Sequence, residues 1–171
     1  MTSRPGDPDA IRARPRARTG YPLALLALLA PASLAGCSSD AEAEAEKLLA
    51  ELQAQDYRSF TRAPGWETPR LPSDGHHGNF VDLYINDVME QAVAAGWPRG
   101  RAPEGAVIIK DGWSDAEGEI LHQIAVMKKG EGGEEWFYAE YTGKGKALEA
   151  GEDFPECLGC HAAGHDYVLA F

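Results

Sequence analysis

The sequence is poor in cysteine and in basic residues, and it lacks several motifs that would assign it to common enzyme classes. It has 3 Cys in 171 residues, and 16 Lys and Arg against 27 Asp and Glu, which gives a formal net charge of −11. Such an acidic chain argues against nucleic acid as a partner. There is no internal repeat, no nucleotide-binding glycine loop and no hydrolase-like serine motif.

The sequence also lacks a hydrophobic run long enough to span a membrane. Residues 1–36 begin with an Arg-rich stretch and continue into a Leu-rich run that Pro22 and Pro31 bracket. That run falls far short of the ~18–20 residues that a transmembrane helix needs. Its layout is that of an N-terminal signal peptide, so we expect the protein to be exported.

The end of this segment predicts a lipid anchor. Leu34-Ala35-Gly36-Cys37 resembles the bacterial lipobox, in which the cysteine is diacylated and becomes the first residue of the mature chain. Cys37 would then hold the protein on the periplasmic side of a membrane. An ordinary cleaved secretory signal is the alternative, and it would leave Cys37 as an odd thiol.

The other two cysteines form the most informative motif. Cys157 and Cys160 stand three positions apart and His161 follows at once, the spacing of a c-type haem attachment site. Two thiols on one helical turn can add to the two haem vinyl groups, while the adjacent imidazole ligates the iron. A thioredoxin-like dithiol lacks its strand-then-helix setting here, and a zinc site lacks a second Cys/His pair. A structural disulfide is the remaining alternative to one covalently bound haem c.

Hydrophobic periodicity predicts a mainly β domain with short helices. We expect an amphipathic helix or tether over residues 41–55, an irregular stretch over 61–78, and a short helix from Asp87, capped with Glu90, that ends by Gly96. Gly130 to Gly133 should close a hairpin, and a turn over 151–155 should lead into the haem motif. Strands are expected over residues 80–85, 106–110, 120–128, 135–141 and 167–171.

An ordered set of short blocks resembles the cytochrome P-460 family over nearly the whole mature domain. The blocks are Gly78-Asn79, Tyr84-Ile85-Asn86, Pro103-Glu104-Gly105, Lys110-Asp111, Val126-Met127-Lys128, Trp136-Phe137-Tyr138, Cys157-Leu158-Gly159-Cys160-His161 and Asp166-Tyr167-Val168. The resemblance implies a mainly β (α+β) fold, an antiparallel sheet with short flanking helices and a C-terminal haem c attachment turn. It also implies a high-spin, five-coordinate iron.

The resemblance assigns Cys157 and Cys160 as thioether anchors and His161 as the proximal, metal-binding ligand. Lys110 stands where hydroxylamine-oxidising members carry a lysine cross-linked to the porphyrin, although a strand-end lysine that extends into solvent is the simple alternative. Related cytochromes c-prime-beta lack the cross-link and bind gases such as nitric oxide. Catalytic members place an acidic residue where this chain has Gln123-Ile124, and Glu140 on the next strand is the alternative carboxylate.

A sixth iron ligand would convert a gas-binding haem into an electron carrier. Each side chain that could supply one has a simpler role. We expect His76 and His77 to be a surface pair in a loop, His122 to be a half-buried strand residue and Met127 to be a core residue. His165 is too close in sequence to His161 to reach the opposite face of the haem.

The predicted organisation is a lipoprotein signal peptide over residues 1–36, an anchor and N-terminal helix over 37–60 and the haem domain over 61–171. From Cys37 onward there are 11 Lys and Arg against 25 Asp and Glu, a formal charge of −14. Expected partners are a small gaseous or nitrogenous ligand, a redox protein and the membrane, and a homodimer is left open. The two functions in view are a ligand-binding or electron-carrying cytochrome and an enzyme that oxidises hydroxylamine or nitric oxide.

Overall fold

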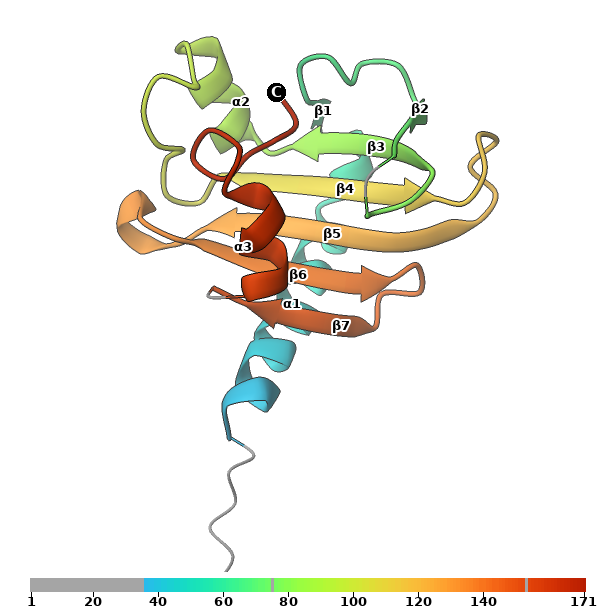
Figure 1. Ribbon diagram of the computed structural model, residues 1–171, viewed down its shortest axis with the longest axis horizontal. Helices are drawn as coiled ribbons and strands as arrows, with labels where there is room; N and C mark the ends of the chain where they lie inside the picture. The colour runs from blue at the N-terminus through green and yellow to red at the C-terminus, as the bar shows by residue number, and fades with distance from the viewer. Residues whose placement is uncertain (1–35, 75, 153) are drawn as a thin grey trace, which may run out of the picture. The chain divides into compact units, whose positions relative to one another are not determined.

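An antiparallel β-sheet forms the centre of the protein, as the computed structural model shows (Figure 1). The structure describes residues 36–74, 76–152 and 154–171. The sheet has the strand order β1-β3-β4-β5-β6-β7, and β2 pairs with β3 beside β1. Its strands are β1 (Thr61–Arg62), β2 (Leu71–Pro72), β3 (Phe80–Ile85), β4 (Val107–Trp113), β5 (Leu121–Lys129), β6 (Trp136–Thr142) and β7 (Ala147–Gly151).

Within the described residues, three α-helices and two 3-10 turns accompany the sheet, which confirms the predicted fold class. In the view of Figure 1, α3 crosses in front of the sheet and α1 lies behind it. The helices are α1 (Gly36–Ala54), α2 (Asp87–Ala94) and α3 (Pro155–His161), and the 3-10 turns are η1 (Tyr57–Ser59) and η2 (Glu131–Gly133).

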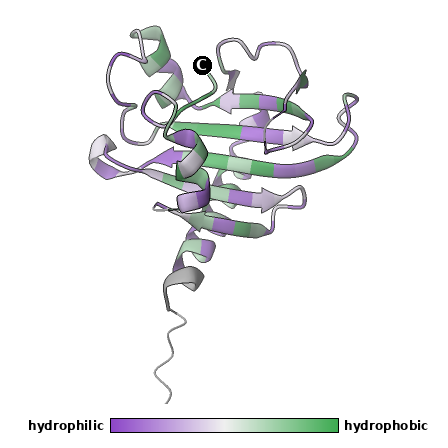
Figure 2. Cartoon of the chain, in the orientation of Figure 1, coloured by the Kyte–Doolittle hydropathy of each residue, from purple (hydrophilic) through white to green (hydrophobic). Residues whose placement is uncertain are grey.

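The sheet is buried on both faces because its central strands are apolar at consecutive positions. On β4, Ile109 contributes to a hydrophobic cluster with α1, whereas its neighbour Ile108 contributes to a second cluster with α3. Val126 and Met127 on β5 divide in the same way. Figure 2 shows β4 changing along its length from hydrophobic to hydrophilic residues, so the polar positions gather toward one end of the strand.

Helix α1 packs on the sheet through the Leu stripe that the sequence predicts. Leu48, Leu49 and Leu52 are buried there, and full burial of such a side chain contributes about 1.5–3 kcal/mol. Tyr141 on β6 donates a hydrogen bond of 2.7 Å from its hydroxyl to the Ala45 carbonyl oxygen. The predicted helix is therefore an integral part of this fold. Among the described helices, none combines the length and apolar character needed to cross a membrane.

A buried carboxylate fixes the segment after α1 to the centre of the sheet. Asp111 on β4 is fully buried and accepts hydrogen bonds from the Tyr57 hydroxyl at 2.8 Å and from Arg58 Nε at 2.6 Å. Burial raises the pKa of Asp111, and Arg58 acts against that increase by stabilising the ionised form. Because side chains alternate along a strand, this attachment holds Asp111 on the α1 face and Lys110 on the other face.

The predicted strands over 80–85, 106–110, 120–128 and 135–141 are confirmed, with β4 extending to Trp113. The hairpin between β5 and β6 is also confirmed, with η2 at its turn. The predicted cap of α2 was wrong, because the N-cap is Asn86 and not Asp87. The Asn86 side chain accepts a hydrogen bond from the Met89 amide, which satisfies a free helix N–H.

The predicted last strand over 167–171 does not form. Asp166 and Tyr167 have φ values of 47° and 64°, which turn the chain sharply and leave only an isolated bridge between His165 and Val168. The structure also contains three strands that the sequence pattern does not predict. The irregular stretch contains β1 and β2, and β7 precedes the haem motif as an edge strand of Ala, Leu and Glu residues without β-branched side chains.

Candidate functional site

A cavity of about 360 Å³ lies on the α3 face of the sheet, a volume within the range of ligand pockets. Four of the predicted site residues, Lys110, Cys157, Cys160 and His161, line it together. They come from the centre of the sheet and from a C-terminal helix, so the fold brings distant parts of the chain to one pocket. The fifth, Cys37, falls near the start of α1, and its side chain lies outside the described residues, as does the predicted signal segment over residues 1–35.

Helix α3 places both thiols and the imidazole on little more than one turn. Pro155 occupies its first turn, where a missing N–H has no cost. Cys157 is half-buried and Cys160 exposed, and both thiols are free. Burial raises the pKa of the Cys157 thiol to about 11. A redox-active dithiol needs a lowered thiol pKa, so this environment does not suit a thioredoxin-like reaction.

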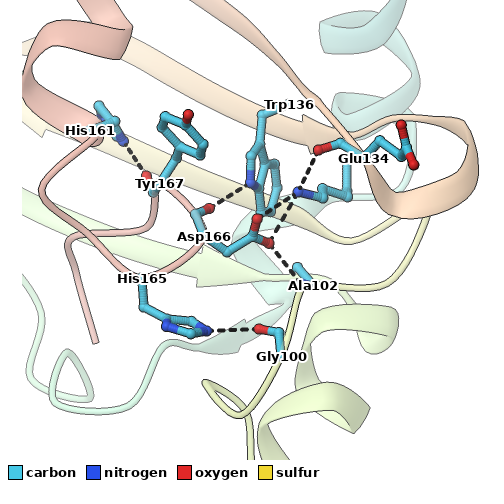
Figure 3. Close-up of polar contacts among 9 residues, drawn as sticks. Gly100, Ala102, Glu134, Trp136, His161, His165, Asp166 and Tyr167 are labelled. Carbon is cyan, nitrogen blue, oxygen red and sulfur yellow. Dashed lines mark hydrogen bonds and ion pairs between the residues drawn. The ribbon is translucent and has the colours of Figure 1, made fainter.

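The His161 ring is oriented through one nitrogen, which leaves the other available. Its Nδ1 lies 2.8 Å from the backbone carbonyl oxygen of Tyr167, so Nδ1 carries the proton and donates it (Figure 3). Burial lowers the pKa of His161 and thereby favours the neutral imidazole. A neutral histidine with Nδ1–H bonded to a carbonyl is the form in which Nε2 ligates a metal. The ring also packs edge-on against Tyr138, with centroids 5.6 Å apart.

Lys110 lies in a row of side chains that crosses the pocket floor. It pairs in register with Leu83 on β3 and with Ala125 on β5, and Ala125 pairs with Glu140 on β6. Burial lowers the pKa of Lys110. The amine makes no hydrogen bond or ion pair with any residue in the described part of the chain. Lys110 is therefore a half-buried side chain at the cavity wall and not the solvent-extended lysine of the simple alternative.

Glu140, the alternative carboxylate named from the sequence, lies at the pocket beside Gln123. Its Oε1 accepts a hydrogen bond of 2.7 Å from Gln123 Nε2, and the same amide nitrogen lies 2.9 Å from His77 Nδ1. His77 Nδ1 is 3.6 Å from Glu140 Oε1, and its proximity is the largest influence that lowers the pKa of Glu140. An ionised carboxylate thus lines the pocket.

The loop that carries His77 rests on the sheet through two glycines. A Cβ added at Gly112 would lie 1.7 Å from the His77 carbonyl oxygen, and one at Gly78 would lie 2.8 Å from the Gly112 Cα. Gly78 also has a φ of 118°, which side chains rarely permit. The close backbone approach brings His77 to the pocket, whereas the sequence favoured a surface pair for His76 and His77.

The remaining sixth-ligand candidates lie in different surroundings. Met127 packs in the core and lines the pocket, as predicted for a core methionine. His122 is exposed, which corrects the half-buried position expected for it, because the register shift opposite Gly112 and Trp113 interrupts regular pairing at this point. His165 Nε2 lies 2.7 Å from the Gly100 carbonyl oxygen, where the two groups form a hydrogen bond.

The pocket residues fit a haem in their chemistry. Ser73 and Asp74 also line the pocket, and most of the remaining lining is apolar, including Leu83, Ile108, Met127 and Val168. Among described residues, the Tyr138 hydroxyl is buried at this wall without a hydrogen-bond partner, an arrangement that a bound group with polar substituents could complete. Two free thiols and an oriented imidazole provide the donor set for attachment and ligation.

A family model described as Cytochrome P460 matches residues 55–170. The matched span contains the pocket floor and the whole of α3. No curated protein matches the chain.

Gly112→Ala should destabilise the protein by about 1–3 kcal/mol, because the new methyl group would force the His77 loop away from the sheet. Gly159→Ala is the matched control, since it adds the same methyl group within α3 where no atom lies within 4 Å. It should be neutral or stabilising by up to about 1 kcal/mol. Urea unfolding of both variants measures the difference, and equal stabilities would contradict the close approach of this loop.

Proposed function

Because the chain belongs to the cytochrome P460 family, whose members bind haem, we propose that it is an exported mono-haem c-type cytochrome. Cys157 and Cys160 would form the two thioether bonds and His161 would ligate the iron. The observation that carries this proposal is the shared pocket. The two thiols and the oriented imidazole line one cavity with an apolar sheet face. When bound, haem c supplies an iron that holds a small ligand or exchanges one electron.

The residues around the pocket support a ligand-binding or electron-transfer role in particular. His161 is kept neutral and directed through Nδ1, so its Nε2 is available to the metal. Apolar side chains form much of the lining, and Glu140, held by a hydrogen bond from Gln123, offers polar atoms to a small nitrogenous ligand such as nitric oxide. Five-coordination of the iron is part of the proposal. His76, His77 and Met127 line the pocket, and each could oppose five-coordination by supplying a sixth ligand.

Oxidation of hydroxylamine or nitric oxide is the second candidate function, favoured by a specific observation. Lys110 is half-buried at the pocket with a lowered pKa, and Glu140 lies two strands away on the same floor. A neutral lysine amine is the nucleophilic form that a bond to the porphyrin would require, and burial favours it. Glu140 could accept a proton from substrate. Gln123 stands where the family resemblance implies an acidic residue, and its side chain donates a hydrogen bond to the Glu140 carboxylate.

Covalent attachment is the first test. Haem should stay with the polypeptide in acidified organic solvent and on a denaturing gel, because thioether bonds survive unfolding. Cys157→Ala or Cys160→Ala should sharply reduce holoprotein, and His161→Ala should remove the proximal imidazole from any protein that still carries haem. Extractable haem would refute the proposal. A low-spin ferrous spectrum that becomes high-spin in His77→Ala would refute five-coordination.

The second test separates the two functions at Lys110. In the enzyme, peptide mapping should find haem joined to a Lys110 peptide as well as to the cysteine peptide, and Lys110→Ala should return the optical spectrum to that of a simple high-spin haem c. Lys128→Ala is the matched control, because this β5 lysine alternates onto the α1 face. A free Lys110 with an unchanged spectrum in Lys110→Ala would leave the ligand-binding or electron-transfer function.

Membrane attachment at Cys37 completes the proposal. Two acyl chains anchor a protein stably where one is marginal. The acidic charge of −14 from Cys37 onward suits a basic redox partner. Cys37→Ser should move the protein from the membrane fraction to the soluble or unprocessed fraction, as judged by fractionation and mass spectrometry. Wild-type protein that is soluble and begins at another residue would exclude the lipid anchor.

A further inference from the structure

A buried ion pair lies directly beside the segment that orients His161. The side chains of Lys129 on β5 and Asp166 after α3 are 0% and 7% exposed, and Lys129 Nζ lies 2.9 and 3.0 Å from the two Asp166 carboxylate oxygens. Lys129 also lies 4.8 Å from the centroid of the Trp136 ring. Desolvation of the two charges opposes formation of such a buried pair. Removing only one partner destabilises the protein strongly, because the other charge is then left buried and unpaired.

Asp166 is held through both its side chain and its backbone (Figure 3). The carboxylate accepts a hydrogen bond of 2.7 Å from the Ala102 amide in addition to those from Lys129. The Asp166 carbonyl oxygen accepts one of 2.8 Å from Trp136 Nε1. These contacts come from the loop before β4 and from the ends of β5 and β6. The position of this one residue is therefore fixed by three separate parts of the fold.

The next carbonyl along the chain is the acceptor for His161 Nδ1. Asp166 and Tyr167 both adopt left-handed backbone conformations, with φ of 47° and 64°. Non-glycine residues hold such angles only when surrounding contacts impose them. A hydrogen bond of 2.9 Å from the Val168 amide to the His165 carbonyl oxygen closes this turn. The contacts on Asp166 hold the turn against the sheet, with the Tyr167 carbonyl oxygen 2.8 Å from the imidazole nitrogen.

We propose that Lys129, Asp166 and Trp136 are positioning residues that set the strength of the hydrogen bond between His161 Nδ1 and the Tyr167 carbonyl, and through it the electronic character of the haem ligand. This inference rests on the proposed function, in which His161 binds iron. A hydrogen bond at Nδ1 increases the basicity of a ligating imidazole. A stronger donor favours ferric over ferrous iron, so loosening these contacts shifts the midpoint potential in the positive direction.

The test compares holoproteins in which covalent haem has first been verified. Lys129→Met with Asp166→Asn removes the pair without leaving a buried charge, and asparagine tolerates the left-handed conformation. Its potential should become more positive and its ferrous iron–histidine stretching frequency should fall in resonance Raman spectra. Lys128→Met with Glu135→Gln is the matched control: it also leaves net charge unchanged, but Lys128 faces the other side of the sheet and Glu135 is exposed. This control should alter neither readout.

Trp136→Phe provides an independent variant should the double variant yield no holoprotein. It keeps an aromatic ring beside Lys129 and removes the donor to the Asp166 carbonyl. A smaller shift of potential and stretching frequency in the same directions supports the proposal. Unchanged values in Trp136→Phe, or in the double variant, overturn it. A wild type with no covalent haem or no iron–histidine band would instead refute the proposed function, so the two failures are distinguishable.

Discussion

The alternation of side chains along the central strands is the constraint on which the rest of the structure depends. Two adjacent residues of β4, Lys110 and Asp111, must point to opposite faces. Asp111 is satisfied on one face by Tyr57 and Arg58 from the segment that follows α1. Lys110 is thereby fixed at the pocket. A shift of register by one residue would exchange the two faces and place the carboxylate in the cavity.

The pocket side of the sheet is completed by a C-terminal segment whose backbone is strained. Two successive left-handed residues cost of the order of 1–3 kcal/mol each. Hydrogen bonds to a charged group contribute about 1.5–3 kcal/mol each, and the Asp166 carboxylate accepts them from Lys129 and the Ala102 amide. The free-energy cost of the backbone conformation and the free energy contributed by these hydrogen bonds are thus of comparable size. This balance explains why a buried charge pair is found at the chain end, where a simple strand was expected.

The sequence was most informative where periodicity or spacing reports directly on local structure. The alternating residues of β3, the glycine-rich hairpin and the Leu stripe of α1 predicted elements that the structure confirms. The sequence was least informative where tertiary contacts determine which residue takes a structural position, such as the N-cap of α2. Asp87 satisfies a capping pattern as well as Asn86 does, but Asn86 also accepts from the Val107 amide and so belongs at the junction of α2 and β4. No local pattern reports such a contact.

The polar residues of the site show the same limit. His76 and His77 resemble a surface pair because their neighbours are polar and a glycine follows. His77 reaches the pocket only because Gly112, 35 positions further on, leaves room for its backbone. Likewise Gln123 seemed to replace a carboxylate, whereas its role in the structure is to hold one. Residues that act together across strands can be identified only when the strand register is known.

That register also explains why Lys110 and Glu140 can remain distinct groups in one pocket. They belong to strands on either side of β5, and Ala125 lies between them. Two strand spacings separate their backbones by about 9–10 Å, so the two side chains do not neutralise each other as a close pair would. Glu140 is instead stabilised as an anion by His77 and Gln123. Lys110 has no such partner in the described chain, and burial drives it toward the neutral amine. The register through Ala125 thus places a lysine with a lowered pKa and a carboxylate with a lowered pKa on the same pocket floor, two strands apart.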